Sequence, residues 1–138
     1  MDGTLLLNNS TVSDEMKAAL DRLIRNGHKL VLTSGRPLDS ILEVMQASDL
    51  FYPGTLVISN NGSLIYDCTA GAPLMEKTVP FPIASGIIRE AEELGIHIQT
   101  YTDHEIVCKK EDEEVIYYRK RIHPVSYTHL RAHETKAN

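Results

Sequence analysis

Residues 29–37 constrain the fold more than any other stretch of this chain, and they read KLVLTSGRP. The apolar half, residues 29–33, shows no polar alternation, as is typical of a parallel strand that is covered on both faces. The strand must end at the following Ser-Gly-Arg-Pro, and proline suits the first position of a helix because its fixed φ is helical. The stretch therefore predicts a buried strand, a turn, and a helix that starts at Pro37 and runs to about Ala47.

The flanking segments extend this pattern into an alternation of helices and strands. Ser13 is a good helix N-cap, apolar residues recur on one face as far as Ile24, and Gly27 can end the helix. A second continuous apolar run, residues 56–59, predicts another buried strand. The order helix, strand, helix, strand predicts an α/β fold with a doubly wound parallel sheet. Asn-Asn-Gly at residues 60–62 favours a tight reversal, so we expect a β-hairpin there.

A second domain is predicted to begin after Pro80. Pro80 and Pro82 interrupt the chain before a new amphipathic helix, whose apolar positions run from Ile83 to Leu94. Strands are expected near residues 96–101 and at residues 105–108. The last fourteen residues, 125–138, show neither helical nor strand periodicity and read as foreign to the fold.

Composition and charge exclude several classes of protein. The net charge of −5 over 138 residues disfavours binding to nucleic acid, which needs clustered Lys and Arg. No apolar run approaches the roughly 18 residues needed to cross a bilayer, and no signal-peptide pattern opens the chain. We therefore predict a cytoplasmic protein with no membrane partner. Cys68 and Cys108 are too few for a disulfide framework and lack the spacing of a zinc site.

Two short polar segments are candidates for chemistry. Asp2-Gly3-Thr4 precedes an apolar run and is, by itself, a common turn sequence. Ser34 follows the end of a predicted strand, where ligands bind in open α/β sheets. The free N–H groups and the dipole of the next helix favour an anion at that point, and a serine hydroxyl adds a donor, which suits a phosphate. The alternative is that Ser34 only caps the helix.

Three motifs in order give the chain a specific resemblance. The segments MDGTLL (residues 1–6), LTSGRP (32–37) and ISNNGSLI (58–65) resemble the Cof-type, subfamily IIB, phosphatases of the haloacid dehalogenase (HAD) superfamily. The resemblance covers about residues 1–124. It implies a Rossmann-like, HAD-type core fragment at residues 1–80 that lacks its first strand, followed at residues 81–124 by the beginning of a C2-type α/β cap.

The resemblance also implies roles for individual residues. The first motif of the family is Asp-x-Asp-Gly-Thr, Met1 stands at its x, and the nucleophilic aspartate would precede Met1. Asp2 then matches the aspartate that protonates the leaving group and activates water, and its backbone carbonyl is a partial ligand of Mg²⁺. Gly3, Ser34 and Gly35 match phosphate-binding positions, with Gly35 allowing close backbone approach.

Two further residues, Arg36 and Asn61, line the same mouth by resemblance and are expected near the substrate or the cap. The later motifs of the family, a lysine that neutralises phosphate and an acidic pair that completes the magnesium site, have no counterpart in this sequence. We therefore expect the chain as given to be inactive.

The function implied by the resemblance is Mg²⁺-dependent hydrolysis of small phosphorylated metabolites, sugar phosphates above all, through a phosphoaspartyl intermediate. Two alternatives stay open. One is a non-catalytic α/β module that binds a phosphorylated ligand or a partner. The other is a relative of phosphomannomutase or sucrose-phosphate phosphatase. The sequence carries no signal for the identity of the substrate or for the oligomeric state.

Other enzyme classes lack their motifs in this chain. Neither Gly-x-Gly-x-x-Gly nor a Walker loop occurs, and Leu32 stands where a serine hydrolase needs glycine. His129 and His133 have the spacing of helical metal ligands but not the His-Glu-x-x-His pattern, so we expect no metal there. The segment that holds them, residues 125–138, resembles a translated sequencing-adapter read-through, and we expect it to be non-native.

Overall fold

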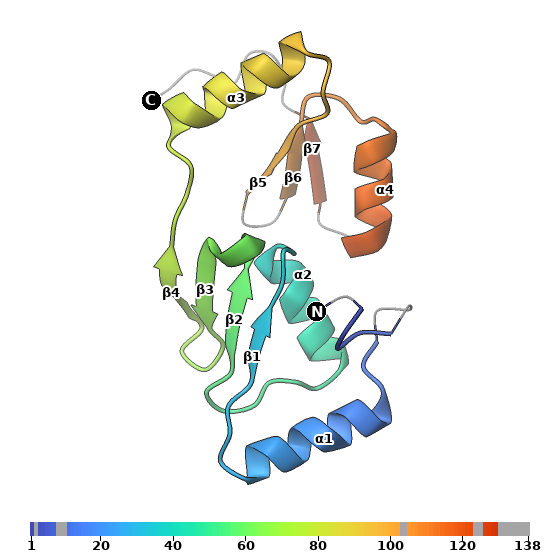
Figure 1. Ribbon diagram of the computed structural model, residues 1–138, viewed down its shortest axis with the longest axis vertical. Coiled ribbons are helices and arrows are strands. Elements are labelled where there is room, and N and C mark those ends of the chain that lie inside the picture. Colours follow the sequence, from blue (N-terminus) through green and yellow to red (C-terminus); the bar gives the residue numbers. More distant parts are fainter. Residues whose placement is uncertain (2, 8–10, 103–104, 123–125, 130–138) are drawn as a thin grey trace. The chain divides into compact units, whose positions relative to one another are not determined.

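The computed structural model describes residues 1, 3–7, 11–102, 105–122 and 126–129, apart from the side chains at positions 105, 119, 121, 122 and 126–129. The chain forms two compact units, unit 1 (Met1–Lys77) and unit 2 (Thr78–Asn138). Each unit has a β-sheet of its own (Figure 1). The boundary lies near the predicted one, and the identity of the two parts as core and cap stays a prediction.

Unit 1 has an α/β fold in which the strands follow the order β1-β2-β3-β4 across the sheet. β1 and β2 are parallel, and β3 and β4 extend the sheet in antiparallel fashion. The predicted order of helix, strand, helix, strand is confirmed. The elements are α1 (Asp14–Arg25), β1 (Val31–Thr33), α2 (Leu38–Ala47), β2 (Leu56–Ser59), the 3₁₀ turn η1 (Asn60–Gly62), β3 (Leu64–Asp67) and β4 (Ala72–Glu76).

Helix α1 begins where the sequence predicts, because its N-cap is satisfied. Ser13 Oγ accepts a hydrogen bond from Met16 N at 3.2 Å. The helix ends at Arg25, and Gly27 then adopts a φ of +84°, a conformation that glycine reaches without strain. Leu20 is buried while Leu23 is half exposed, so α1 contacts the rest of unit 1 through a narrow stripe.

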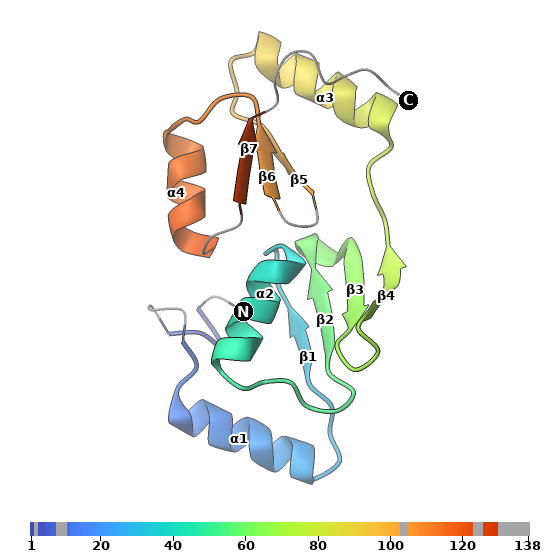
Figure 2. The ribbon, with the colours of Figure 1, turned by 180° about the vertical axis from the view of Figure 1, so that it is seen from behind.

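Strand β1 is covered on one face, whereas the sequence predicted cover on both. Leu32 is 5% exposed and Val31 is 47% exposed. The reason is that Leu20 of α1 and Ile41 of α2 belong to the same buried cluster as Leu32, so both helices pack on the side to which Leu32 points. The two opposite views show α2 lying over that one face (Figure 1, Figure 2).

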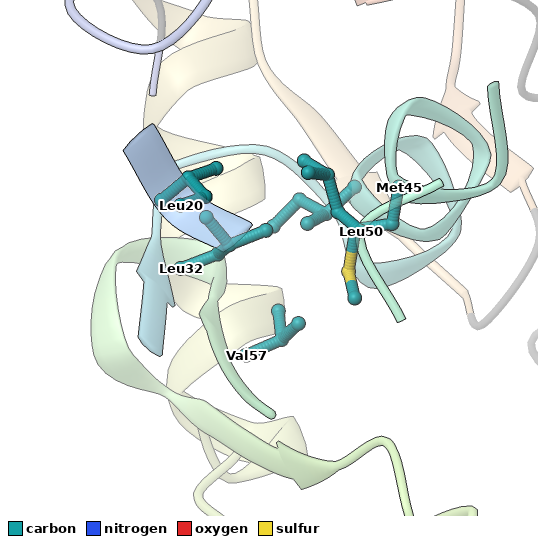
Figure 3. Close-up of a cluster of buried hydrophobic side chains, with 6 residues drawn as sticks. Leu20, Leu32, Met45, Leu50 and Val57 are labelled. Carbon is teal, nitrogen blue, oxygen red and sulfur yellow. The ribbon is translucent and has the colours of Figure 1, made fainter. Parts of the chain in front are cut away.

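The core of unit 1 is a single cluster of apolar side chains from the two helices, the two parallel strands and the loop after α2. Figure 3 shows these side chains converging. Each buried aliphatic side chain of this size stabilises the fold by roughly 1.5–3 kcal/mol. The cluster therefore fixes the strands whose ends carry the predicted site. Its buried members are Leu20, Leu32, Ile41, Met45, Leu50 and Val57.

Helix α2 begins one residue later than predicted. Pro37 is extended, with a ψ of 152°, and its carbonyl oxygen accepts a hydrogen bond from Ile41 N at 3.3 Å. Pro37 is therefore the N-cap, and Leu38 is the first helical residue. A proline side chain has no acceptor, so it leaves the N–H groups of the first turn without a side-chain cap.

The hairpin predicted after β2 forms, and β4 then adds a strand that the sequence analysis did not predict. In the turn before β4, Asp67 Oδ1 accepts hydrogen bonds from Thr69 N at 2.8 Å and Ala70 N at 3.0 Å. Gly71 completes the turn with a φ of +65°. Asp67 and Gly71, at the two ends of this turn, were therefore an available turn signal. Pro73 is tolerated in β4 because β4 is an edge strand.

Unit 2 pairs β5 antiparallel and β7 parallel to the central strand β6. Helix α3 forms as predicted, but none of its residues is buried, and Ile83 and Ile87 are 55% and 50% exposed. Strand β7 was not predicted, because the sequence analysis read residues 125–138 as foreign to the fold. The other residues of that segment lie outside the described residues. None of the described helices is long and apolar enough to cross a membrane. The elements are α3 (Phe81–Glu93), β5 (Gln99–Tyr101), β6 (Glu105–Cys108), α4 (Glu113–Ile122) and β7 (Ser126–His129).

Candidate functional site

Three of the predicted site residues form one tight turn between β1 and α2, the Ser34 turn (Ser34, Gly35, Arg36). Ser34 N donates to Ile58 O of β2 at 2.9 Å and so extends the parallel pairing beyond the end of β1. Ser34 Oγ accepts a hydrogen bond from Arg36 N at 3.2 Å, which fixes the oxygen while the hydroxyl keeps its own hydrogen to donate. The turn thus holds a hydroxyl donor at the carboxyl end of two parallel strands, where α/β sheets bind ligands.

A second turn, the Asn61 turn (η1, Asn60–Gly62), follows β2 and is bonded to the Ser34 turn. Asn60 N donates to Arg36 O at 3.1 Å, and Asn61 N donates to Ser34 O at 3.4 Å. Asn60 and Asn61 have φ values of +48° and +56°, in the left-handed region that asparagine tolerates better than most residues. The two backbone bonds therefore join the loops after β1 and β2.

The side chain of Asn61 lies against Gly35. A Cβ atom added to Gly35 would stand 2.6 Å from Asn61 Oδ1 and 3.3 Å from Asn61 Cγ. Sequence reasoning placed both residues at the same mouth, and the structure brings them into contact. The sequence did not predict that the Asn61 side chain fills the space where a Cβ of residue 35 would lie, because that depends on the pairing of β1 with β2.

Arg36 is buried, at 6% exposure, rather than projecting freely from the turn. Its Nη1 donates to Ser40 Oγ at 3.4 Å, and Ser40, in the first turn of α2, is itself buried. In this arrangement the guanidinium packs along α2. The predicted contact of Arg36 with substrate or cap stays a prediction.

The described residues around Asp2 place the first predicted motif, Asp2-Gly3-Thr4, next to the Ser34 turn. Met1 N is 3.4 Å from Thr33 O, the last residue of β1. Met1 O accepts hydrogen bonds from Leu5 N at 3.0 Å and Leu6 N at 3.2 Å, so the opening residues curl into a turn in which Gly3 has a φ of +69°. Asp2 itself lies outside the described residues. The residue before it and the Ser34 turn nevertheless meet at the same end of β1.

The described residues do not form a metal site. Among them, no group of three or more His, Cys, Asp or Glu side chains lies close enough together to hold an ion. Mg²⁺ prefers oxygen ligands in octahedral geometry, and carboxylates usually supply the protein's share. The predicted ligand, Asp2, falls outside this part of the chain, so the described donor set does not fit Mg²⁺ on its own.

One buried polar group near the site was not anticipated. Ser59 ends β2 and precedes the Asn61 turn, and it has no exposed surface. Its Oγ makes no hydrogen bond within the described part of the chain. A buried hydroxyl without a partner costs roughly 1–3 kcal/mol, which marks this strand end as locally destabilised.

Unit 2 contains a separate polar cluster that sequence reasoning missed. His97 Nδ1 is 2.7 Å from Asp112 Oδ2, and His97 Nε2 is 3.2 Å from Gln99 Oε1. Asp112 Oδ1 also accepts a hydrogen bond from Val115 N at 3.1 Å in α4. Burial alone would lower the pKa of His97, but the bonds to Asp112 and Gln99 outweigh it and raise that pKa. The bond from Val115 N, followed by the His97 bond, keeps the pKa of Asp112 below its usual value against opposing burial.

The His97–Asp112 pair predicts that the stability of unit 2 depends on pH. The raised pKa means that the contribution of His97 is fully present below about pH 6.5 and is lost as the pH rises through the folded-state pKa. The lowered pKa of Asp112 adds stability above about pH 3.8 that is lost as the pH falls through its folded-state pKa. We expect the urea midpoint, followed by the amide signals of β5 and β6, to be higher at pH 5.5 than at pH 8.5.

The matched control is His28→Gln, since His28 is exposed in unit 1. His97→Gln should flatten the pH dependence above pH 5.5, whereas His28→Gln should leave it in place. A pH dependence that survives in His97→Gln would show that another group is responsible.

The model of the haloacid dehalogenase-like hydrolase family matches residues 1–138 of this chain. The chain belongs to this family. Its α/β architecture agrees with that membership, so the predicted family and the predicted HAD-type, Rossmann-like fold class are confirmed. The roles predicted for the individual site residues stay predictions.

Individual relatives agree with the family in sequence and in fold. The chain is 37% identical over 65 residues to the Bacillus subtilis protein named "Putative phosphatase YxeH", covering 47% of this chain and 24% of that one. A haloacid dehalogenase-like hydrolase from B. subtilis matches with a TM-score of 0.72 and 27% identity, over 86% of this chain and 40% of the other. The HAD subclass IIB sugar phosphatase BT4131 shares the fold, with a TM-score of 0.74 and 16% identity, over 94% of this chain and 50% of the other. The chain spans 24–38% of the length of three curated relatives it matches.

Proposed function

We propose that the chain carries part of the active site of a phosphatase that acts on small phosphorylated metabolites. The observation that supports the proposal most is the Ser34 turn. A hydroxyl donor and the N-terminus of α2, which has no side-chain cap, stand together at the carboxyl end of β1, beside the residue that precedes Asp2. Family membership supplies the reaction class, hydrolysis.

The described groups suit a phosphoryl dianion. The Ser34 hydroxyl can donate to one oxygen, and the N-terminus of α2 carries the positive end of the helix dipole, which favours an anion. Asp39 also lies in the first turn of α2, and its carboxylate opposes an anion. The phosphoryl group is therefore expected to sit nearer to Ser34 than to Asp39.

We assign to Asp2 the role of general acid and base. A phosphate ester leaves as a poor alkoxide unless it is protonated, and a positioned carboxyl group typically contributes about 10²- to 10⁴-fold to the rate. The contact between Met1 N and Thr33 O supports this role, because it brings the neighbour of Asp2 to the end of β1. A phosphoaspartyl intermediate needs a second carboxylate as nucleophile.

The proposal for the whole enzyme includes Mg²⁺ as cofactor and sugar phosphates as substrates. Both come from the resemblance of the three sequence motifs, and the fold shared with the sugar phosphatase BT4131 agrees with the substrate class.

A phosphate-binding module without turnover is the second candidate. The Ser34 turn supports it as well, because a hydroxyl donor at a helix N-terminus binds a phosphate whether or not the ester is then hydrolysed. The two candidates share the phosphate site and differ in whether a bound ester is hydrolysed. A phosphate titration therefore tests the site, and an assay for hydrolysis separates the candidates.

Ser34→Ala is expected to weaken the binding of inorganic phosphate by about tenfold, equivalent to about 1.4 kcal/mol. The substitution removes one donor to a charged oxygen and leaves the backbone of the turn unchanged. Titrating the chain with phosphate at constant ionic strength and following the amide NMR signals of the Ser34 turn measures the affinity.

Ser48→Ala is the matched control, because Ser48 stands at the other end of α2 as its C-cap. It should change phosphate affinity by less than about twofold. Wild-type signals that do not shift in a saturable way would overturn the phosphate site, and so would an unaltered affinity in Ser34→Ala. The step that separates the candidates uses the full-length protein, because the chain as given is expected to be inactive. Release of phosphate from an aryl phosphate only with Mg²⁺ would favour the enzyme, while binding without release would favour the module.

A further inference from the structure

At Gly35 the backbone conformation would allow a side chain, but the side chain of Asn61 occupies the space where its Cβ would lie. Six glycines of the described chain adopt positive φ, and Gly35 is not among them. Its backbone would accept a side chain, but a Cβ atom there would stand 2.6 Å from Asn61 Oδ1, far inside van der Waals contact. A side chain at position 35 would therefore displace the carboxamide of Asn61.

The carboxamide of Asn61 is delivered to Gly35 by a constrained backbone. Asn61 has φ 56° and ψ 29°, a conformation that only a few residue types adopt readily. Asn61 N bonds to Ser34 O, and Asn60 N bonds to Arg36 O, so carbonyl groups on both sides of Gly35 are held by the Asn61 turn. The side chain then packs on the middle of the segment that these two bonds enclose.

We propose that Asn61 is a positioning residue for phosphate binding: its carboxamide packs against Gly35 and holds the Ser34 turn in the shape that presents the Ser34 hydroxyl to the anion. Asn61 acts through the turn and does not itself touch the phosphate. This inference rests on the proposed phosphate site. It adds to that site a residue that supports the Ser34 turn without contacting the phosphate.

A double-mutant cycle between positions 35 and 61 tests the inference. Asn61→Gly keeps the left-handed backbone and removes the carboxamide, and we expect it to weaken binding of inorganic phosphate by about tenfold. Gly35→Ala forces the carboxamide of Asn61 to move away and should weaken binding by about as much. In the double variant the clash partner is gone, so its affinity should be no lower than that of Asn61→Gly alone.

A spectroscopic signature separates positioning from a general loss of stability. Without phosphate, the amide signals of Ser34 and Gly35 should move in Asn61→Gly, since the turn relaxes. The control is Asn26→Gly, the same substitution at the C-cap of α1. It should leave the amide signals of Ser34 and Gly35 in place and change the phosphate affinity by less than about twofold.

The possible outcomes distinguish this inference from the proposed function. If the wild-type chain does not bind phosphate, the proposed phosphate site fails, and the positioning role fails with it. If the wild-type chain binds phosphate and Asn61→Gly binds equally well, only the positioning role of Asn61 is overturned. It is also overturned if the double variant loses the product of the two single effects, because Gly35 would then serve the ligand directly.

Discussion

Replacing Ile41 by alanine is expected to lower the free energy of unfolding of unit 1 by about 2–5 kcal/mol. Ile41 lies in α2, has no exposed surface and packs in one cluster with Leu32 and Val57. The substitution removes apolar surface from the core and leaves a cavity that the two parallel strands cannot close without moving. Because small domains are stable by only about 5–15 kcal/mol in total, the loss should be evident in urea unfolding followed by far-ultraviolet circular dichroism.

The control for this substitution is Ile87→Ala, the same change in another helix. Ile87 lies in α3 and is 50% exposed, so its removal leaves no cavity. We expect a change of less than about 0.5 kcal/mol, partly because alanine has the higher helix propensity. Equal losses at the two positions would mean that the cluster around Ile41 is not the core of unit 1.

The elements that sequence reasoning predicted well carry their signals within a few residues. Helix α1 is marked by the Ser13 cap and by Gly27, and strand β2 is an apolar run bounded by polar turns. The Asn-Asn-Gly reversal is of the same kind, since it depends on backbone preferences of the residues in the turn. These features depend on local chemistry, which one sequence contains in full.

The features that were missed depend on which surfaces meet. Val31 and Leu32 are both apolar, and only the packing of α1 and α2 on one side makes the first exposed and the second buried. The same holds for α3, whose apolar positions correctly predict a helix although none of its residues is buried. Strands β4 and β7 have no strong sequence pattern of their own, and their pairing with β3 and β6 defines them.

The same distinction between local signals and packing applies to the candidate site. Ser34 could be predicted because a hydroxyl after a buried strand and before a helix has a known position in an α/β sheet. The packing of Asn61 on Gly35 could not, since it requires the register that pairs Thr33 with Ile58. The hydrogen bond of Arg36 to Ser40 likewise depends on how the side chain turns along α2.

The register of β2 therefore links the core to the site. Val57, in the middle of the core cluster, precedes Ile58, whose carbonyl accepts the hydrogen bond from Ser34 N, and the strand then leads into the Asn61 turn. A substitution that destabilises β2 is therefore expected to weaken both the Ser34 N–Ile58 O hydrogen bond and the bonds from the Asn61 turn to the Ser34 turn.

Val57→Thr tests this link, because threonine has nearly the shape of valine and adds a hydroxyl. Val57 has no exposed surface, so the new hydroxyl would be buried among apolar side chains, and we expect a loss of about 1–3 kcal/mol in the free energy of unfolding. Val31→Thr in the neighbouring strand β1 is the matched control, since Val31 is 47% exposed and its hydroxyl would reach water. That change should stay within about 0.5 kcal/mol. If Val57→Thr lowered the free energy of unfolding as little as Val31→Thr does, the face of β2 toward α2 would be accessible to water. The core around Val57 would then not be what supports the Ser34 turn.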